Sequence, residues 1–135
     1  GRNILKIDKS KRYDDGIEKS NGKSLIDDFF IFSQIIEDIK YGKTVSEISF
    51  KFHNTLAQIV LDISNYARKY NNIFNIALSG GVFQNSYLLD LCFELLENNG
   101  FKVYSNFKVP VNDGGISLGQ AYVASLKKYP SRKGA

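Results

Sequence analysis

Apolar residues recur at helical spacing in two consecutive segments of the chain. The first segment follows Asp27 and Asp28, either of which can cap a helix, and it ends at Gly42. The second begins at Thr44, with Glu47 three residues later, which is the spacing of a capping box. We therefore predict two helices with these apolar stripes: Phe29, Phe32, Ile35, Ile36 and Ile39 in the first, and Val45, Ile48, Phe52, Leu56, Ile59, Val60, Ile63, Ala67 and Tyr70 in the second.

Shorter runs predict strands. Residues 3–8 form the first, and two short segments flank Asn21-Gly22, a strong hairpin signal because both residues tolerate positive φ. Residues 73–78 are apolar apart from Asn75, which is typical of a buried parallel strand. Residues 101–104 form a further strand.

Two helices complete the order of elements. Asn85 or Ser86 opens a helix that ends at Gly100, with Leu88, Leu91, Cys92, Leu95 and Leu96 on its apolar face. Residues 116–126 form a last helix. Three leading strands followed by helices and a βαβα unit predict an α/β fold, a ribonuclease-H-like mixed sheet of five strands covered by helices. Residues 73–78 and 101–104 should run parallel to each other and to residues 3–8, within a single domain spanning 1–135.

Two glycine pairs, Gly80-Gly81 and Gly114-Gly115, each follow a predicted parallel strand and precede a helix. They should meet at one edge of the sheet, where ligands of α/β folds bind. Glycine lets backbone N–H groups approach a phosphate closely, and a helix N-terminus adds positive potential. The alternative is that the glycines only form tight turns.

Three further features of the sequence could have a structural or a functional role. Asp113 lies beside the second glycine pair, either as a helix cap or as an oxygen ligand for a hard metal ion. His53 is the only histidine, so helix packing is favoured over a metal or catalytic role. Gly42-Lys43-Thr44 is not a P-loop, because position 37 is Glu and a helix precedes it.

Amino-acid composition and charge limit the classes of function that this chain can have. The 135 residues are 43% hydrophobic and 24% charged, as in ordinary globular proteins. The net charge of +4 comes from lysines and arginines mixed with acidic residues, without aromatic interleaving, so nucleic-acid binding is not favoured. No segment is apolar enough to span a membrane and no signal peptide is expected. Cys92 is expected to be a core thiol in a cytoplasmic protein.

Two stretches together resemble a known family. Residues 77–85, Ala-Leu-Ser-Gly-Gly-Val-Phe-Gln-Asn, and residues 109–121, Val-Pro-Val-Asn-Asp-Gly-Gly-Ile-Ser-Leu-Gly-Gln-Ala, are similar to the C-terminal part of the HypF carbamoyltransferases of [NiFe]-hydrogenase maturation. Residues 52–57, Phe-His-Asn-Thr-Leu-Ala, also match the family's pattern. The resemblance covers about residues 42–124.

The resemblance implies the second lobe of an actin-like domain related to the tRNA threonylcarbamoyl transferases. Gly80, Gly81, Asn85, Gly114 and Gly115 would bind the phosphates of ATP or carbamoyl-adenylate, and Asp113 would ligate a divalent metal ion. The intact protein would use carbamoyl phosphate and ATP, and would transfer the carbamoyl group to the C-terminal cysteine of HypE. No catalytic residue is assigned within this chain.

The chain also departs from that family. It lacks the His-x-x-x-His pair that shares the metal, so the metal site would be incomplete and the chain would be a fragment, inactive by itself. A non-catalytic nucleotide-binding or interaction lobe of the same fold is the alternative, because fold does not determine chemistry. A phosphotransferase of the sugar-kinase type is a third possibility.

Overall fold

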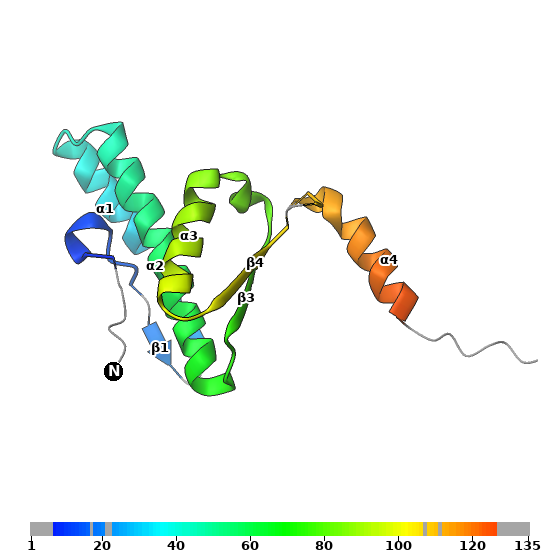
Figure 1. Cartoon of the computed structure of the whole chain (residues 1–135). Coiled ribbons are helices and arrows are strands. Elements are labelled where there is room, and N and C mark those ends of the chain that lie inside the picture. Colours follow the sequence, from blue (N-terminus) through cyan, green and yellow to red (C-terminus); the bar gives the residue numbers. More distant parts are fainter. Residues whose placement is uncertain (1–6, 17, 21–22, 107, 111, 127–135) are drawn as a thin grey trace, which may run out of the picture.

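A computed structural model describes residues 7–16, 18–20, 23–106, 108–110 and 112–126 of the chain. Its helices and strands form an α/β arrangement in which the last helix projects away from the other elements (Figure 1). No helix in these described ranges is long and apolar enough to cross a bilayer. The elements are η1 (Lys9–Lys11), β1 (Glu18–Ser20), β2 (Lys23–Leu25), α1 (Asp28–Lys40), α2 (Val45–Asn71), β3 (Asn75–Leu78), η2 (Gly81–Gln84), α3 (Ser86–Asn98), β4 (Lys102–Ser105), η3 (Asp113–Gly115) and α4 (Ile116–Leu126).

The helices begin at the predicted caps. The Asp27 side chain accepts a hydrogen bond from the Phe30 amide at 3.1 Å, and this bond starts α1. Thr44 and Glu47 form the reciprocal pair of a capping box at the start of α2. Gly42 has a φ of +73°, a left-handed conformation in which glycine is least strained. Local side-chain chemistry thus sets where these helices start and stop.

The strands form two separate two-stranded sheets among the described residues, so the prediction of one five-stranded sheet is not met there. β3 and β4 are parallel, as predicted, with Ile76 opposite Val103. β1 and β2 form the predicted antiparallel hairpin, whose turn residues lie outside the described ranges. β1 and β2 have only three residues each, so each strand offers few backbone hydrogen bonds for joining a second sheet.

The first predicted strand, residues 3–8, lies mostly outside the described residues. Its last two positions are not in a strand. Asp8 instead caps the short turn η1, accepting hydrogen bonds from the Ser10 backbone and hydroxyl at 2.7 and 2.6 Å. A side chain that bonds its own neighbouring backbone competes with strand pairing, so this end of the prediction is wrong.

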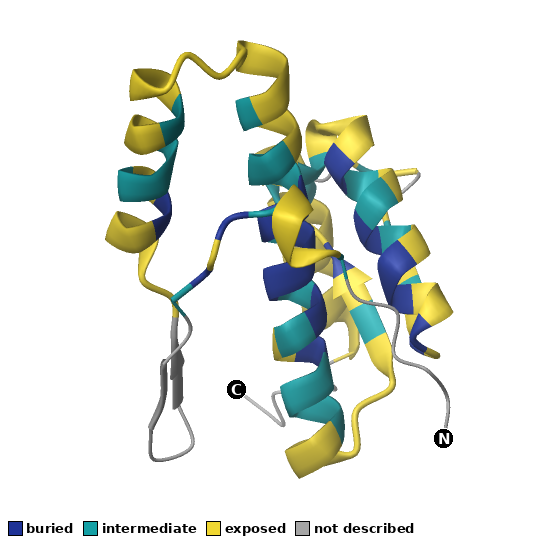
Figure 2. Cartoon of the chain, turned by 90° about the vertical axis from the view of Figure 1, so that its left-hand side faces the viewer, coloured by how far each residue is buried: buried dark blue, intermediate teal, exposed yellow. Residues whose placement is uncertain are grey.

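The main core lies between α2, α3 and the β3–β4 sheet (Figure 2). α3 packs along α2 over many residues, and Ile76 and Val103 of the sheet pack against the same cluster. The buried members are Ala57, Leu61, Leu78, Leu88, Cys92, Leu95, Leu96 and Phe101. The predicted apolar face of α3 is therefore confirmed, with Leu91 at the margin of the core.

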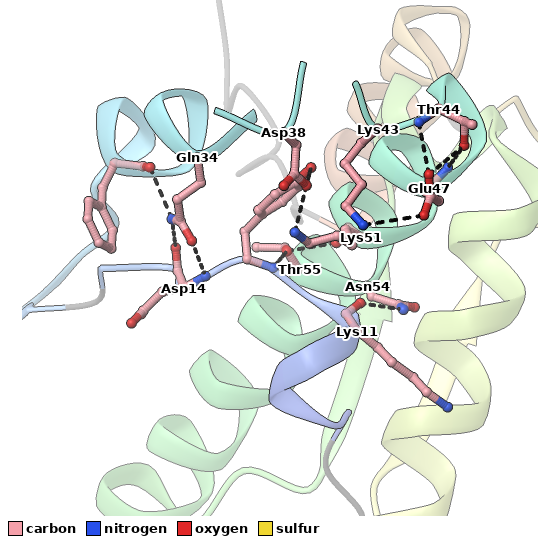
Figure 3. Close-up of polar contacts among 12 residues, drawn as sticks. Lys11, Asp14, Gln34, Asp38, Lys43, Thr44, Glu47, Lys51, Asn54 and Thr55 are labelled. Carbon is pink, nitrogen blue, oxygen red and sulfur yellow. Dashed lines mark hydrogen bonds and ion pairs between the residues drawn. The ribbon is translucent and has the colours of Figure 1, made fainter. Parts of the chain in front are cut away.

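The N-terminal segment is tied to α2 by polar side chains. Asn54 donates to the Lys11 carbonyl at 2.8 Å, and the Thr55 hydroxyl accepts from the Tyr13 amide at 2.8 Å (Figure 3). Gln58 accepts from the amide of residue 7 at 3.1 Å. All three side chains are buried, and each is matched to a backbone group that would otherwise lose its hydrogen bond on burial. Three backbone groups of this segment, the N–H groups of residues 7 and 13 and the carbonyl of Lys11, thus have partners without a sheet.

An ion pair joins α1 to α2 beside the same segment. Lys51 lies 2.6 Å from Asp38 and 4.2 Å from the centre of the Tyr13 ring (Figure 3). The Tyr13 hydroxyl donates to the same carboxylate at 3.0 Å. The hydrogen bond from Lys51 is the main reason that the pKa of Asp38 lies below its usual value. Burial raises the pKa of Tyr13.

Several predicted core positions are exposed instead. Only Ile35 of the predicted stripe of α1 packs into a core cluster, whereas Phe29 is 79% exposed. In α2, Val45 is 84% exposed, because the buried face of this helix includes Asn54, Thr55 and Gln58 and not Val45. β3 starts at Asn75 and buries only Leu78, so the prediction of a fully buried strand is wrong. The other exposed members of these segments are Phe32, Ile36, Ile39, Ile63, Tyr70 and Ile73.

Candidate functional site

The two loops predicted to meet at one edge of the sheet do so. Ser79 and Gly80 follow β3, and Asn106 follows β4, so all three lie at the carboxyl ends of the parallel strands. Together with the loop that leads into α4 they line a cavity of about 360 Å³. The residues that this loop and α4 contribute are Pro110, Asn112, Asp113, Gly115 and Ile116.

The first glycine pair leaves open space at this edge. Gly80 has a φ of +107°, which side chains other than glycine rarely adopt, and it precedes the single turn η2. A Cβ atom added at Gly80 or at Gly81 would meet nothing within 4 Å. The first N–H groups of the turn, those of Gly81 and Val82, have no acceptor within the turn itself. The loop therefore presents backbone donors beside unfilled space.

The second glycine pair lies in more crowded surroundings. A Cβ atom at Gly115 would lie 2.6 Å from the Pro110 carbonyl oxygen, a distance that only glycine avoids. At Gly114 it would lie 3.1 Å from the Asn112 side-chain oxygen. Gly115 lines the cavity, and Gly114 does not. The structure thus supports the tight-turn interpretation for this pair. The absence of a side chain at Gly115 lets the start of α4 approach the Pro110 carbonyl in the preceding loop.

Asn112, and not Asp113, is the cap at this point. The Asn112 side chain accepts from the Gly114 amide at 3.0 Å, so of the two interpretations of Asp113 the helix cap does not hold. Asp113 is an exposed residue that lines the cavity, and its carboxylate has no hydrogen bond or ion pair with any residue that the structure describes. Within the described ranges, no group of three His, Cys, Asp or Glu side chains could hold a metal ion. One carboxylate alone does not form a metal site.

Asn85 closes the first loop and does not line the cavity. Its side-chain oxygen accepts from the Leu88 amide at 3.1 Å, which caps α3 as predicted. Its amide nitrogen lies 2.8 Å from Nε2 of His53 on α2. The sequence interpretation of His53 as a packing residue missed this contact, because residues 32 positions apart carry no periodic signal for it.

A second hollow adjoins the first. It has a volume of about 670 Å³ and shares Asn106 and Gly115 with the smaller cavity. Val109, Leu118 and Tyr122 give it apolar walls between the segment after β4 and the projecting helix α4. Neither Asn106 nor these walls were predicted. Asn106 could have been found, because it follows its strand just as Ser79 follows the parallel neighbour.

Cys92 has no place in this site. It is fully buried in α3, and burial raises the pKa of its thiol to about 11. A thiol with that pKa carries almost no thiolate at neutral pH and is a poor nucleophile. The prediction that Cys92 is a core residue is confirmed.

The fold and the site define an α/β lobe in which two loops after parallel strands enclose a polar cavity next to an apolar one. The family model that matches this chain over residues 3–120 describes the second subdomain of a carbamoyltransferase, Kae1-like domain. The chain belongs to this family.

Relatives agree with the family match. The chain is 38% identical over 73 residues to carbamoyltransferase HypF of Synechocystis sp. and 33% identical over 86 residues to that of Rhodobacter capsulatus, covering 54% and 64% of this chain. These matches span only 9% and 11% of the two relatives.

Solved structures of the same family superpose on the chain. A full-length HypF crystallised in a phosphate- and nucleotide-bound form matches 88% of this chain and 16% of its own, at 47% identity and a TM-score of 0.81. HypF of T. kodakarensis matches 93% of this chain and 15% of its own, at 28% identity and a TM-score of 0.67. The chain thus corresponds to about a sixth of the length of these proteins.

Proposed function

We propose that this chain is the nucleotide-holding lobe of an actin-like carbamoyltransferase domain within a longer, cytoplasmic protein of the HypF type. The observation that carries the proposal is the open backbone edge at Gly80 and Gly81, next to a cavity that Asp113 also lines. The nucleotide bound to the related full-length HypF supports the same ligand class. In this proposal the lobe binds ATP or carbamoyl-adenylate.

The two cavities suggest how the ligand would lie. Phosphate groups would occupy the smaller cavity, where backbone N–H groups of the glycine loop can donate to them. The larger hollow has the apolar walls that suit a flat aromatic base. Because the hollows share Asn106 and Gly115, one extended nucleotide could occupy both.

The chemistry would be a transfer of the carbamoyl group from carbamoyl-adenylate to a thiol of the partner HypE. The sulfur of the C-terminal cysteine thiolate would attack the carbamoyl carbon, the bond from that carbon to the phosphate oxygen would break, and AMP would leave. The lobe's own contribution would be to hold the phosphate and to stabilise its charge with N–H donors. Cys92 cannot replace the partner's thiol, since it is buried and protonated.

Asp113 would provide one oxygen ligand to a divalent metal ion. Asp113 lines the smaller cavity, and its carboxylate is not engaged with other described side chains. The remaining ligands would come from the preceding lobe of the longer protein. When bound, such an ion would neutralise charge on phosphate oxygens.

The test is Gly81→Val in the complete protein. The new side chain enters space that is empty of other protein atoms, so folding should be retained, while phosphate can no longer reach the N–H groups. Calorimetric titration with ATP should show an affinity loss of more than tenfold, or about 1.4 kcal/mol. A folded variant that binds ATP as tightly as the wild type refutes the phosphate role of this loop.

A further inference from the structure

His53 and Asn85 form part of a hydrogen-bond chain between α2 and the start of α3. Nδ1 of His53 lies 2.7 Å from the carbonyl oxygen of Ser49, and Nε2 lies 2.8 Å from the amide nitrogen of Asn85. The other end of the Asn85 amide accepts from the Leu88 backbone at 3.1 Å. The imidazole also contacts the Tyr87 ring edge-on, with 5.3 Å between centroids.

The donors and acceptors in this chain can be assigned from the backbone groups at its two ends. A carbonyl oxygen only accepts, so Nδ1 of His53 carries a proton, and Nε2 must offer its lone pair if the group of Asn85 that faces it is a donor. The Leu88 amide only donates, so the Asn85 oxygen must face it and the Asn85 NH2 group must face His53. The neutral tautomer of His53 and the orientation of the Asn85 amide therefore support each other.

This arrangement leaves one donor for a ligand. The Asn85 NH2 group has two hydrogens, and the contact with Nε2 of His53 uses one of them. Asn85 is exposed and ends the loop that begins at Gly80. We infer that His53 is a positioning residue, which holds the Asn85 amide so that its second N–H can donate to the nucleotide bound at the glycine loop. The inference rests on the proposed nucleotide-binding function.

A pair of substitutions separates hydrogen bonding from packing. His53→Phe keeps an aromatic ring beside Tyr87 but removes the acceptor. His53→Gln loses the ring but keeps an oxygen that can accept from Asn85. If His53 positions Asn85, ATP affinity of the complete protein falls about fivefold in His53→Phe and stays within about twofold of wild type in His53→Gln, as expected for one neutral hydrogen bond. If His53 only packs, the order of the two variants is reversed.

Asn85→Asp tests whether the Asn85 N–H group itself contacts the nucleotide, because aspartate retains the cap of α3 but has no side-chain N–H group. Its ATP affinity should fall at least as far as that of His53→Phe, and the double variant should bind no more weakly than Asn85→Asp alone. Additive losses in the double variant would overturn the inference, since two independent contributions are not one positioned donor.

The Gly81→Val variant shows which part of the measured ATP binding belongs to this loop. Binding that is present in the wild-type isotherm and absent from that of the variant occurs at the loop, even if the longer protein has other nucleotide sites. Wild type and Gly81→Val with identical isotherms would overturn the proposed function and this inference together. A clear Gly81→Val effect with no change in His53→Phe would overturn this inference alone.

Discussion

Replacing Asp113 by Asn tests the metal proposal with little structural disturbance. The cap at this position is the Asn112 side chain, 3.0 Å from the Gly114 amide, so the substitution leaves the capping hydrogen bond in place. The Asp113 carboxylate is exposed and has no ion pair in the described part of the chain. What remains is its attraction to the N–H groups of the first helical turn, about 0.3–1 kcal/mol for a surface site.

That magnitude predicts a small change in stability. For a protein domain of this size, 1 kcal/mol corresponds to a few degrees in melting temperature, so Asp113→Asn should lower it by less than about 3 °C. Asn112→Ala is the matched control for capping, and it should cost about 1 kcal/mol because it removes the side chain that accepts from Gly114. The ranking of the two variants shows which residue caps the helix.

Activity should respond to Asp113→Asn far more strongly. A neutral amide cannot supply the anionic oxygen that a hard divalent ion prefers, so carbamoyl transfer to the partner thiol should fall by about a hundredfold or more in the complete protein. The assay follows the carbamoylated cysteine of the partner by mass spectrometry while melting is recorded on the same sample. Full activity with an unchanged melting temperature would refute the metal role of Asp113.

Two further predictions concern stability. Gly115→Ala should destabilise the start of α4 by about 1–3 kcal/mol, because its Cβ would lie 2.6 Å from the Pro110 carbonyl oxygen. The control is Gly81→Ala, whose Cβ meets open space. Amide hydrogens of α4 should exchange faster in Gly115→Ala than in this control, and equal exchange rates would contradict the prediction. Burial raises the pKa of Cys92 to about 11, so the unfolded thiol ionises at lower pH than the folded one and stability falls as pH rises from about 9 toward about 11. Cys92→Ala should show a shallower decline in urea melts over that range; identical slopes would show that the thiol does not contribute.

Much of the local structure could be predicted because short-range chemistry decides it. The caps at Asp27, Thr44 and Asn85 involve residues only three positions apart, so their types and spacing are sufficient. The meeting of the two loops was also predictable, since parallel strands with helical crossovers bring their carboxyl ends to one edge. The structure places Gly80, Asp113 and Gly115 at the cavity. As ligand contacts, all the predicted site residues stay predictions, including Gly81, Gly114 and Asn85, which do not line it.

Burial could not be predicted as well from periodicity. The sequence presents the stripe of α2 as apolar, yet its buried face includes Asn54, Thr55 and Gln58. These polar side chains are buried because backbone groups of residues 7–13, some 40–50 positions away, need hydrogen-bond partners. In α1, Ile31 and Ile35 pack into a core cluster, whereas the other members of the predicted stripe remain exposed, an outcome that depends on which segments lie alongside the helix.

Within the site, the amino-acid sequence alone determines which backbone segments can approach a phosphate, because glycine and the strand–loop–helix order are local properties. Tertiary structure decides which glycine is open and which is crowded: Gly81 faces empty space, whereas Gly115 lies against the Pro110 carbonyl. It also brings His53 to Asn85 across 32 positions. Contacts of this kind arise only when α2 and α3 pack together, because the distances between side chains on different helices depend on that packing and not on spacing along the chain.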